Sequence, residues 1–484
     1  MKSRISIPHI LLLAFVAFAA GVPAKLQTEI NNLNKDIALT HGCWGLTVID
    51  LDSGKVIASN DPDRSMIPAS TMKILTTGAA MGLLGSEYRY TTFIEYDGVY
   101  DIAEGVVHGN IYIRGTGDPT LGSSHFPADT VNGFASLPKK LKEMGIKIIE
   151  GNIYGDKSFF SDNPLPDGWT WGDLGQYYGA GTSGLDYKDN KVILFFNSMQ
   201  GDSGRLTKVY PQPKGIKYVT YVTANGKKDE AYVYGSLNGS SYTVYGSIPA
   251  GKKDYEVEAS NPEPALTCAE DVYNACLARG IIVGGSPKVW GRNEQRNSKP
   301  FVRKTLLQFA SPKLRDIIEV TNKHSDNIYA EQLLRTLGAL NGEDGTTEAG
   351  ATVVKNYWAG IGTDVDGMYV MDGSGLSRSN LVTTKQQAMI LYKISKMSWY
   401  ADFDASLPVA GKEGSMSSLC KGTCAENNMR AKTGYINRAR GYAGYVKTKS
   451  GRNVCFSLLA NNYTCTPTEM KKKLEKILIA IAEM

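Results

Sequence analysis

Alternating and continuous apolar segments near both ends of the chain predict β-strands. Trp44–Asp50 and Val56–Ala58 flank the turn residues 52–54, a pattern that is typical of a hairpin. Near the C-terminus, turn residues separate three segments of small and apolar residues. These segments predict consecutive strands at 428–434, 440–446 and 453–461.

Apolar residues at helical spacing predict helices beside these strands. Leu26–Ala38 predicts an opening helix, and the run from Ile74 to Leu84 predicts a mostly buried one. Asp316–Val320 and Ile328–Leu340 show the same spacing. The polar residues 323–325 between them predict a short connection between two helices.

The middle of the chain has a different pattern. Val106–Ile113, a helical stretch that ends at Met144, and Ile148–Tyr154 predict a strand–helix–strand unit. Residues 188–261 are rich in Tyr, Val, Gly, Ser and Thr, with short alternating segments and turns, which predicts a small all-β domain. The sequence leaves open whether this domain binds a polymer or a partner, or acts only as a spacer.

The first candidate for chemistry lies at the start of the predicted buried helix. Ser70 and Lys73 are three residues apart, so they share one face of a helix that begins near Pro68. A serine hydroxyl needs a base to become nucleophilic, and burial shifts a lysine toward its neutral, basic form. The same spacing recurs at Ser418 and Lys421, but in a polar stretch between two cysteines. We therefore expect Ser70 to be the nucleophile.

The second candidate is Ser325-Asp326-Asn327, in the predicted connection between two helices. Its serine hydroxyl could relay protons, and the amide of Asn327 could bind a peptide backbone. Another Ser-Asp-Asn, at residues 161–163, precedes a turn-rich loop with nothing to position it, so we expect no catalytic role there. His324 is interpreted as a loop residue, because Lys73 already supplies a base.

The third candidate, Lys432-Thr433-Gly434, lies on the predicted strand 428–434 and occurs once in the chain. The lysine would project from a strand edge beside a cleft, and the glycine would let a substrate backbone approach closely. The three elements, in this order and each in a suitable context, predict a serine acyl-transfer site.

With these elements, the chain resembles the class C low-molecular-mass penicillin-binding proteins, a family of D-Ala-D-Ala carboxypeptidases and endopeptidases. The resemblance covers essentially the whole mature chain, and the long interval between Lys73 and Ser325 is typical of the family's large insertions. Four further segments carry it: Arg114-Gly-Thr-Gly-Asp-Pro-Thr-Leu, Gly155-Asp-Lys-Ser-Phe-Phe, Asp372-Gly-Ser-Gly-Leu-Ser-Arg378 and Ala410-Gly-Lys-Glu-Gly-Ser-Met416.

The resemblance implies an α/β (α+β) fold built on a serine β-lactamase/transpeptidase-like catalytic module, residues 25–91 and 297–484. This module would hold an antiparallel sheet of about five strands with helices on both faces. An inserted α/β domain would comprise residues 92–187 and 262–296. The small β domain, residues 188–261, would be nested within it, so that the first and last segments of the chain pair in one sheet.

The family mechanism implies a catalytic set without a metal or cofactor: Ser70, Lys73, Ser325, Asn327 and Lys432. Ser70 would attack the penultimate D-Ala carbonyl of a peptidoglycan stem peptide, and Lys73 would accept its proton. Ser325 and Lys432 would pass a proton to the departing amine. Lys432 would add positive potential, and Asn327 would hold the peptide. Penicillins and other β-lactams imitate this substrate and would acylate Ser70.

Substrate-binding roles are implied for Thr433, Gly434 and Tyr435. The family usually has Thr or Ser at the position of Tyr435, so a hydroxyl that helps to bind the substrate's terminal carboxylate is missing here. Arg440, on the facing strand, is a candidate to replace it. The backbone N–H groups of Ser70 and Tyr435 would form the oxyanion hole.

Asp156 and Arg378 match family positions near the mouth of the cleft. A carboxylate and a guanidinium could together hold the free amine and carboxylate at the end of a diaminopimelate side chain. The alternative is a pair of surface charges with little effect.

Residues 1–24 predict a secretory signal, because Lys2 and Arg4 precede an apolar stretch from Ile10 to Ala20 and a short cleavage region. We therefore expect an exported, periplasmic protein, and no later run is apolar enough to predict a membrane span. The formal net charge is +5. Without a basic cluster, this charge gives no indication of nucleic-acid binding.

Seven cysteines in an exported chain predict disulfides, with one thiol left over. The connectivity stays open. The local candidates are Cys420 with Cys424 and Cys268 with Cys276, whereas Cys43 and Cys455 lie in predicted strands as candidate buried thiols.

Three other functions stay open for these motifs. A β-lactamase would need a glutamate positioned to activate water, and no convincing Glu-x-x-x-Asn element follows the second motif. A non-catalytic peptidoglycan-binding protein is disfavoured, because Ser70, Lys73 and Lys432 are all present. An exported esterase or amidase could use the same serine and lysine, and the choice between carboxypeptidase and endopeptidase is also open.

Overall fold

The computed structural model describes residues 22–126, 133–199, 203–237, 239–341 and 344–484. The expected secretory signal lies outside the described residues except for its last three, which lead into helix α1 (Ala24–Asn34). In the part of the chain that is described, no helix is both long enough and apolar enough to cross a bilayer.

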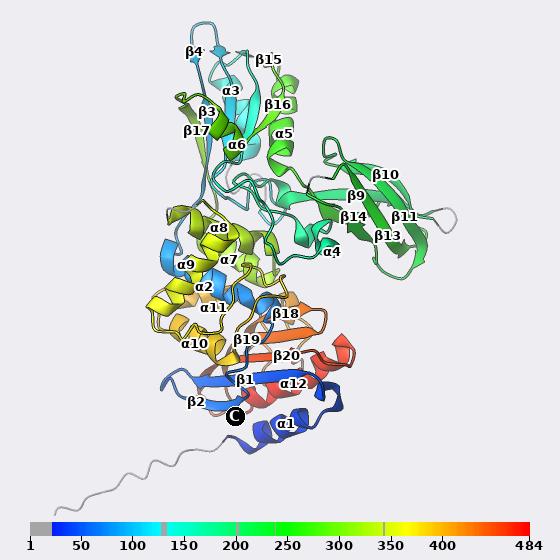
Figure 1. Ribbon diagram of the computed structural model, residues 1–484, viewed down its shortest axis with the longest axis vertical. Coiled ribbons are helices and arrows are strands. Elements are labelled where there is room, and N and C mark those ends of the chain that lie inside the picture. The colour runs from blue at the N-terminus through cyan, green and yellow to red at the C-terminus, as the bar shows by residue number, and fades with distance from the viewer. Residues whose placement is uncertain (1–21, 127–132, 200–202, 238, 342–343) are drawn as a thin grey trace, which may run out of the picture.

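A five-stranded antiparallel sheet joins the two ends of the chain, in the lower part of Figure 1. β1 pairs with β20 along its whole length, from Cys43 opposite Asn461 to Asp50 opposite Val454. The predicted strand number and the pairing of the first and last segments are confirmed. The order is β18 (Arg430–Ile436), β19 (Ala439–Lys447), β20 (Asn453–Asn461), β1 (Cys43–Asp50) and β2 (Val56–Asn60).

Helices cover both faces of this sheet, because successive strand residues point to opposite faces and both faces are apolar. On one face, Phe456 and Leu458 pack with α1 and α12 (Pro467–Ala482). On the other face, Cys455 and Leu459 pack with α2 (Lys73–Leu84) and α10 (Thr384–Ile394). The same side also holds α7 (Leu314–Lys323), α8 (Asn327–Leu340), α9 (Thr347–Gly360) and α11 (Tyr400–Ser406).

The chain between α2 and α7 builds the upper part of the molecule (Figure 1) around two sheets, ordered β16-β8-β6-β3-β17 and β15-β7-β5-β4. The first half supplies β3 (Thr91–Tyr96), β4 (Val99–Asp101), β5 (Val106–His108), β6 (Ile111–Arg114), α3 (Leu137–Glu143), β7 (Ile148–Ile149) and β8 (Ile153–Asp156). The second half supplies α5 (Pro264–Ala278), β15 (Ile282–Val283), β16 (Pro287–Trp290), α6 (Arg292–Asn297) and β17 (Lys304–Ala310).

The predicted strand–helix–strand unit is confirmed, although each predicted strand is split between the two sheets. β6 runs parallel to β8 and β5 runs parallel to β7, with α3 between them in sequence. The start of the second catalytic segment was expected at residue 297. However, β17 pairs with β3 from Lys304 opposite Tyr96 to Ala310 opposite Thr91, so residues 304–310 lie in the sheet of the insertion.

The nested segment is all-β, as its composition predicted, and projects sideways in Figure 1. Two three-stranded sheets pack on a common core that includes Leu194, Phe196, Val222 and Val244. One sheet is β10 (Arg205–Tyr210), β9 (Lys191–Asn197) and β14 (Tyr255–Ser260). The other is β11 (Lys217–Gly226), β13 (Ser241–Pro249) and β12 (Tyr232–Tyr234), with the short helix α4 (Trp171–Leu174) beside it.

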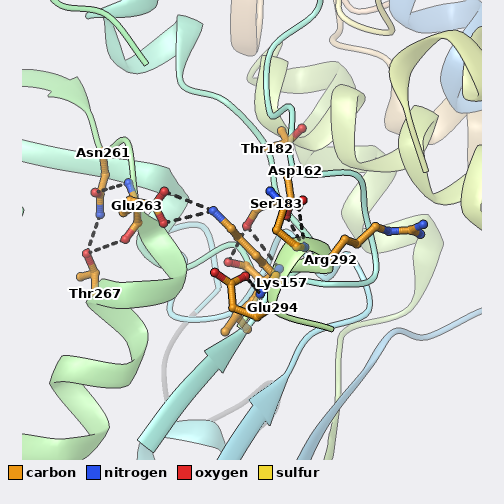
Figure 2. A network of polar contacts seen from close by, with 12 residues as sticks. Lys157, Asp162, Thr182, Ser183, Asn261, Glu263, Thr267, Arg292 and Glu294 are labelled. Atoms are coloured by element: carbon orange, nitrogen blue, oxygen red, sulfur yellow. Dashed lines mark hydrogen bonds and ion pairs between the residues drawn. The ribbon is translucent and has the colours of Figure 1, made fainter. Parts of the chain in front are cut away.

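Polar contacts join the first and second halves of the insertion (Figure 2). Lys157, directly after β8, forms an ion pair with Glu263 just before α5 at 3.2 Å. The carboxylate of Asp162 accepts the backbone N–H groups of Arg292 (3.1 Å) and Asn293 (3.0 Å) at the start of α6. The second Ser-Asp-Asn match therefore satisfies a helix N-terminus, which is a structural role.

The expected disulfides are not formed: all seven cysteines lie in the described residues, and each is a free thiol. Cys268 and Cys276 are both buried on the continuous helix α5. Eight residues of helix rise about 12 Å, which exceeds the roughly 7 Å that a disulfide allows between Cα atoms. Cys455 is buried in its strand as expected, and Cys43 is half-buried.

Candidate active site

Ser70 lies in a 3-10 turn, Ala69–Met72, that leads directly into α2, so it is near a helix N-terminus as expected. The turn packs against β18. A β-carbon added at Gly434 would come within 2.5 Å of the Pro68 carbonyl oxygen and 3.1 Å of the Ser70 nitrogen. The glycine therefore accommodates the backbone of the serine turn. The sequence analysis had assigned this close approach to a substrate.

Lys73, the first residue of α2, is fully buried beside Ser70. Its Nζ donates to Ser70 Oγ (3.2 Å), to Asn327 Oδ1 (2.6 Å) and to the backbone carbonyl of Ser374 (2.7 Å). The last two contacts hold the amine in place, and the first puts it within reach of the hydroxyl proton.

Burial lowers the pKa of Lys73 to about 8. Three nearby acidic side chains oppose this effect: Asp372, Asp326 and Glu331. With this pKa, about a tenth of the Lys73 side chains are neutral at pH 7, and the neutral amine is a base. The electrostatics therefore agree with Lys73 as the group that activates Ser70.

Lys432 and Ser325 form a second lysine–serine contact at the same place. Lys432 Nζ donates to Ser325 Oγ (2.9 Å) and to the Thr433 carbonyl oxygen (3.0 Å). Ser325 lies between α7 and α8 with φ of 60°. Lys432 is two residues from Gly434, on the face of β18 that meets the serine turn. The fold therefore brings all three sequence elements together.

Burial and the neighbouring charge of Lys73 lower the pKa of Lys432 well below its usual range. This direction disagrees with the expected contribution of positive potential from Lys432. It agrees with proton transfer, because a lysine that loses its charge easily can both accept and donate a proton.

The Asn327 amide makes two hydrogen bonds within the protein. Its Oδ1 accepts from Lys73, and its Nδ2 donates to the backbone carbonyl of Tyr178 (2.8 Å), a residue of the insertion. The amide thus positions Lys73, and the expected contact of Asn327 with the peptide stays a prediction, because Nδ2 has a second N–H. The carbonyls of Tyr178 and Ser374 were missed, and the sequence carries no signal for them because every residue has a carbonyl.

Two buried carboxyl groups hold the segment that supplies the Ser374 carbonyl. Glu331 on α8 accepts the N–H groups of Gly373 (2.8 Å) and Ser374 (2.9 Å), and burial raises its pKa to about 8. Asp372 accepts the indole N–H of Trp169 (2.8 Å). Asp372 belongs to a segment that carried the family resemblance, but Glu331 had no sequence signal beyond its place on a helix.

Comparison with known proteins decides the family. A model of the D-Ala-D-Ala carboxypeptidase 3 (S13) family matches residues 26–483, nearly the whole chain. The chain belongs to this family.

Two curated proteins and a solved structure illustrate the relationship. The D-alanyl-D-alanine carboxypeptidase of Actinomadura sp. (strain R39) is 27% identical over 480 residues, covering 95% of this chain and 85% of that protein. D-alanyl-D-alanine carboxypeptidase DacB of Haemophilus influenzae is 26% identical over 483 residues, covering 98% and 96%. The crystal structure of penicillin binding protein 4 (dacB) from Haemophilus influenzae has the same fold, with a TM-score of 0.76 at 24% identity over 92% of this chain and 97% of that chain. The protein is thus a serine-type carboxypeptidase of the S13 family.

In this S13 carboxypeptidase, Arg440 faces away from Ser70. Gly441, opposite Gly434, meets the serine turn, so its neighbour Arg440 points to the other face of the sheet. The guanidinium lies over the Tyr435 ring (4.7 Å) and donates to Tyr442 Oη (3.3 Å). This position contradicts the expected contact between Arg440 and the substrate carboxylate.

We therefore expect Arg440→Ala to affect stability and not substrate binding. The free energy of unfolding should fall by about 1 kcal/mol, because a cation–π contact and a hydrogen bond are lost. The KM for a D-Ala-D-Ala peptide should stay within about twofold of wild type. The reason is that the lost contacts are internal to the protein and do not involve the substrate. Thermal melting and peptide kinetics test this pair. A roughly tenfold rise in KM at unchanged melting temperature would restore the original expectation.

Asp156 and Arg378 are not brought together as a substrate grip. Asp156, at the end of β8, is buried and forms an ion pair with Arg303. Arg378 is exposed and donates to the backbone carbonyl of Asn437 (3.4 Å). Asp156 is therefore not available to bind the amine of a diaminopimelate side chain as expected, because Arg303 already neutralises its carboxylate.

The second Ser-x-x-Lys match has no catalytic surroundings. Ser418 is exposed, and its Oγ accepts from Lys471 Nζ (2.5 Å) on α12. No hydrogen bond joins Ser418 to Lys421 within the described ranges. His324 lies against His125, with ring centroids 4.8 Å apart, which agrees with a loop role.

Gly434→Ala tests the close approach of β18 to the serine turn. The new methyl would meet backbone atoms, which cannot swing away, so we expect a loss of about 1–3 kcal/mol in stability. We also expect acylation to slow by about tenfold or more, because a displacement of the order of 1 Å in a reacting group costs about 100-fold. Gly360→Ala is the matched control, since nothing lies within 4 Å of its added β-carbon. Acylation at the wild-type rate in Gly434→Ala would show that the turn tolerates the methyl.

Proposed function

We propose that this protein is an exported D-Ala-D-Ala carboxypeptidase/endopeptidase that cleaves peptidoglycan stem peptides through an acyl-enzyme on Ser70 and is inhibited by β-lactams. The observation that carries this proposal is the 3.2 Å contact between Ser70 Oγ and the buried Nζ of Lys73, whose pKa is lowered to about 8. A hydroxyl beside a neutral amine has the arrangement of an activated nucleophile.

The reaction would proceed in two steps. Lys73 takes the proton of Ser70 as Oγ bonds to the carbonyl carbon of the penultimate D-Ala. The C–N bond then breaks, and the leaving amine receives a proton through Ser325 and Lys432. Water hydrolyses the resulting ester and frees Ser70.

Backbone groups would stabilise the tetrahedral intermediate. The N–H groups of Ser70 and Tyr435 are the candidates for the oxyanion hole, because β18 lies directly against the serine turn at Gly434. One such donor contributes about 3–4 kcal/mol to transition-state stabilisation. Thr433 is half-buried beside Lys432 and stays the candidate for the substrate's terminal carboxylate.

Inhibition by β-lactams is supported by one related structure. Penicillin binding protein 4 (dacB) from Haemophilus influenzae has been solved in complex with a β-lactam, and that chain shares this fold. Export to the periplasm is supported by the charged and apolar pattern of residues 1–24. We retain the proposed division into catalytic, inserted and nested domains, with the second catalytic segment starting after β17.

A gel with fluorescent penicillin, combined with an assay for released D-Ala, tests the proposal. A stable covalent adduct together with D-Ala release supports it. Rapid turnover of the penicillin without an adduct would favour a β-lactamase, and hydrolysis of simple esters without labelling would favour an esterase. Neither labelling nor hydrolysis would leave a non-catalytic binding protein.

A further inference from the structure

The nested β domain carries an exposed face of aromatic and hydroxyl side chains. In the sheet β11-β13-β12, alternate residues such as Val222 and Val244 enter the core, so the residues between them point outward. Serine, threonine and asparagine occupy most other outward positions, and the charged residue among them is Lys217, at the start of β11. Four outward positions are tyrosines: Tyr221, Tyr232, Tyr234 and Tyr245.

The aromatic rings of this face form a continuous row. Tyr245, on the central strand, is paired with Tyr221 on one side and Tyr232 on the other. The Tyr221 and Tyr245 rings stack at 5.2 Å and 11°. Tyr234 meets Tyr245 at 6.0 Å and Trp171 of α4 at 4.9 Å. We call Trp171, Tyr234, Tyr245 and Tyr221 the aromatic row.

Three of the four side chains in the aromatic row are exposed, and the fourth, Tyr234, is half-buried. The exposed fractions are 64% for Trp171, 60% for Tyr221 and 48% for Tyr245. Cross-strand tyrosine pairs do stabilise a sheet, but that role does not need a tryptophan from a separate helix. A contiguous exposed patch of this kind marks an interaction site.

The aromatic row is held in a fixed position relative to the active site. Trp169, two residues before Trp171, donates to Asp372 of the catalytic module. In the same segment, Gln176 Nε2 donates to the carbonyl of Val233 on β12 (3.0 Å). The Tyr178 carbonyl then accepts from the active-site amide described above. Helix α4 therefore lies between the catalytic module and the nested sheet (Figure 1).

We propose that the aromatic row binds the glycan strand of peptidoglycan and thereby presents the attached stem peptides to Ser70. This inference rests on the proposed function, because the peptides cleaved there are attached to that strand. A pyranose ring has an apolar C–H face, which an aromatic ring buries, and a rim of hydroxyl and amide groups, which serine, threonine and tyrosine can bind. A nearly uncharged face suits a neutral sugar polymer, whereas a charged partner is matched by opposite charges.

The test is sedimentation of the full chain with purified sacculi and with glycan strands freed of their stem peptides. Both are measured in the Ser70→Ala background, so that the outcome does not depend on acyl transfer. The doubly substituted variant Tyr221→Ala/Tyr245→Ala should bind both materials at least about tenfold more weakly. Tyr221→Phe/Tyr245→Phe should retain binding within about threefold, because the rings remain. Tyr369→Ala is the matched control, an exposed tyrosine on the catalytic module.

A variant on α4 shows whether weaker binding results only from misfolding of the sheet. Trp171→Ala lies outside the strands, and we expect it to weaken sedimentation about fivefold or more at unchanged melting temperature. The proposal would be overturned if Tyr221→Ala/Tyr245→Ala and Trp171→Ala both sedimented as the wild type does. So would binding of wild-type protein to sacculi but not to peptide-free strands, since the peptides would then carry the affinity.

A kinetic measurement separates this inference from the proposed function. With Ser70 intact, the doubly substituted tyrosine variant should cleave a short soluble D-Ala-D-Ala peptide at the wild-type rate and release D-Ala from sacculi about tenfold more slowly. Equal losses on both substrates would overturn a glycan-binding role. If neither substrate is cleaved by the wild type, the proposed function fails, and sedimentation still decides whether the aromatic row binds glycan.

Discussion

Ser70→Ala is expected to abolish covalent labelling by penicillin and to lower D-Ala release at least about 10⁴-fold. Without the hydroxyl, no acyl-enzyme can form, and the remaining site can only bind the substrate. The fold should persist, because within the described residues the Ser70 hydroxyl has one hydrogen-bond partner, Lys73. Gel labelling, mass spectrometry of the intact protein and a thermal melt measure the three quantities.

Ser418→Ala is the matched control for this prediction. Ser418 has the same spacing to a lysine, but it is exposed and its hydroxyl contacts Lys471 on the surface. We expect labelling and D-Ala release at wild-type levels. Loss of label in Ser418→Ala, with its fold preserved, would mean that the nucleophile has been assigned to the wrong motif.

Lys73→Ala is expected to slow acylation by about 10²–10⁴-fold, the range for removal of a positioned base. The reason is geometric as well as electrostatic, since Nζ is the buried group that contacts Ser70 Oγ at 3.2 Å. Stopped-flow or quenched acylation with a penicillin measures the rate. Lys421→Ala, from the second Ser-x-x-Lys match, is the control and should acylate normally.

The pH dependence of acylation gives the same residue a second test. The reactive form of Lys73 is the neutral amine, which is populated above its pKa of about 8. The wild-type rate should therefore rise about tenfold per pH unit well below pH 8 and level off above it. This rise should be absent in Lys73→Ala. A wild-type rate that is flat between about pH 6 and pH 9 would contradict Lys73 as the base.

Much of the fold could be predicted because its signals are local. The strands near both chain ends and the helices around 74–84 and 328–340 follow from apolar periodicity, and each lies close to its predicted place. Ser70 and Lys73 meet because three residues of a helix separate them, which is also a local relation. The family resemblance predicted that the sheet has five strands, because apolar periodicity alone does not show how many strands pair in one sheet.

Several expectations failed where the partner of a residue is distant in sequence. Asp156 was expected at the cleft, but Arg303, which follows the nested domain, neutralises it. The start of the second catalytic segment was placed before β17, which pairs with β3 across the whole insertion. The candidate disulfide between Cys268 and Cys276 was suggested by their spacing alone, and the continuous helix between them keeps the two thiols apart.

The sequence by itself identified the candidates for chemistry, because Ser70, Lys73 and Lys432 appear in motifs whose local structure can be predicted. Only the tertiary structure decided which contacts each candidate residue makes. It joined Lys432 to Ser325, turned the Asn327 amide toward Lys73 and placed Arg440 on the far face of the sheet. The physical reason is that the pKa, the hydrogen-bond partners and the orientation of a side chain depend on its burial and on its contacts with distant segments. These exist only once the chain has packed into its tertiary structure.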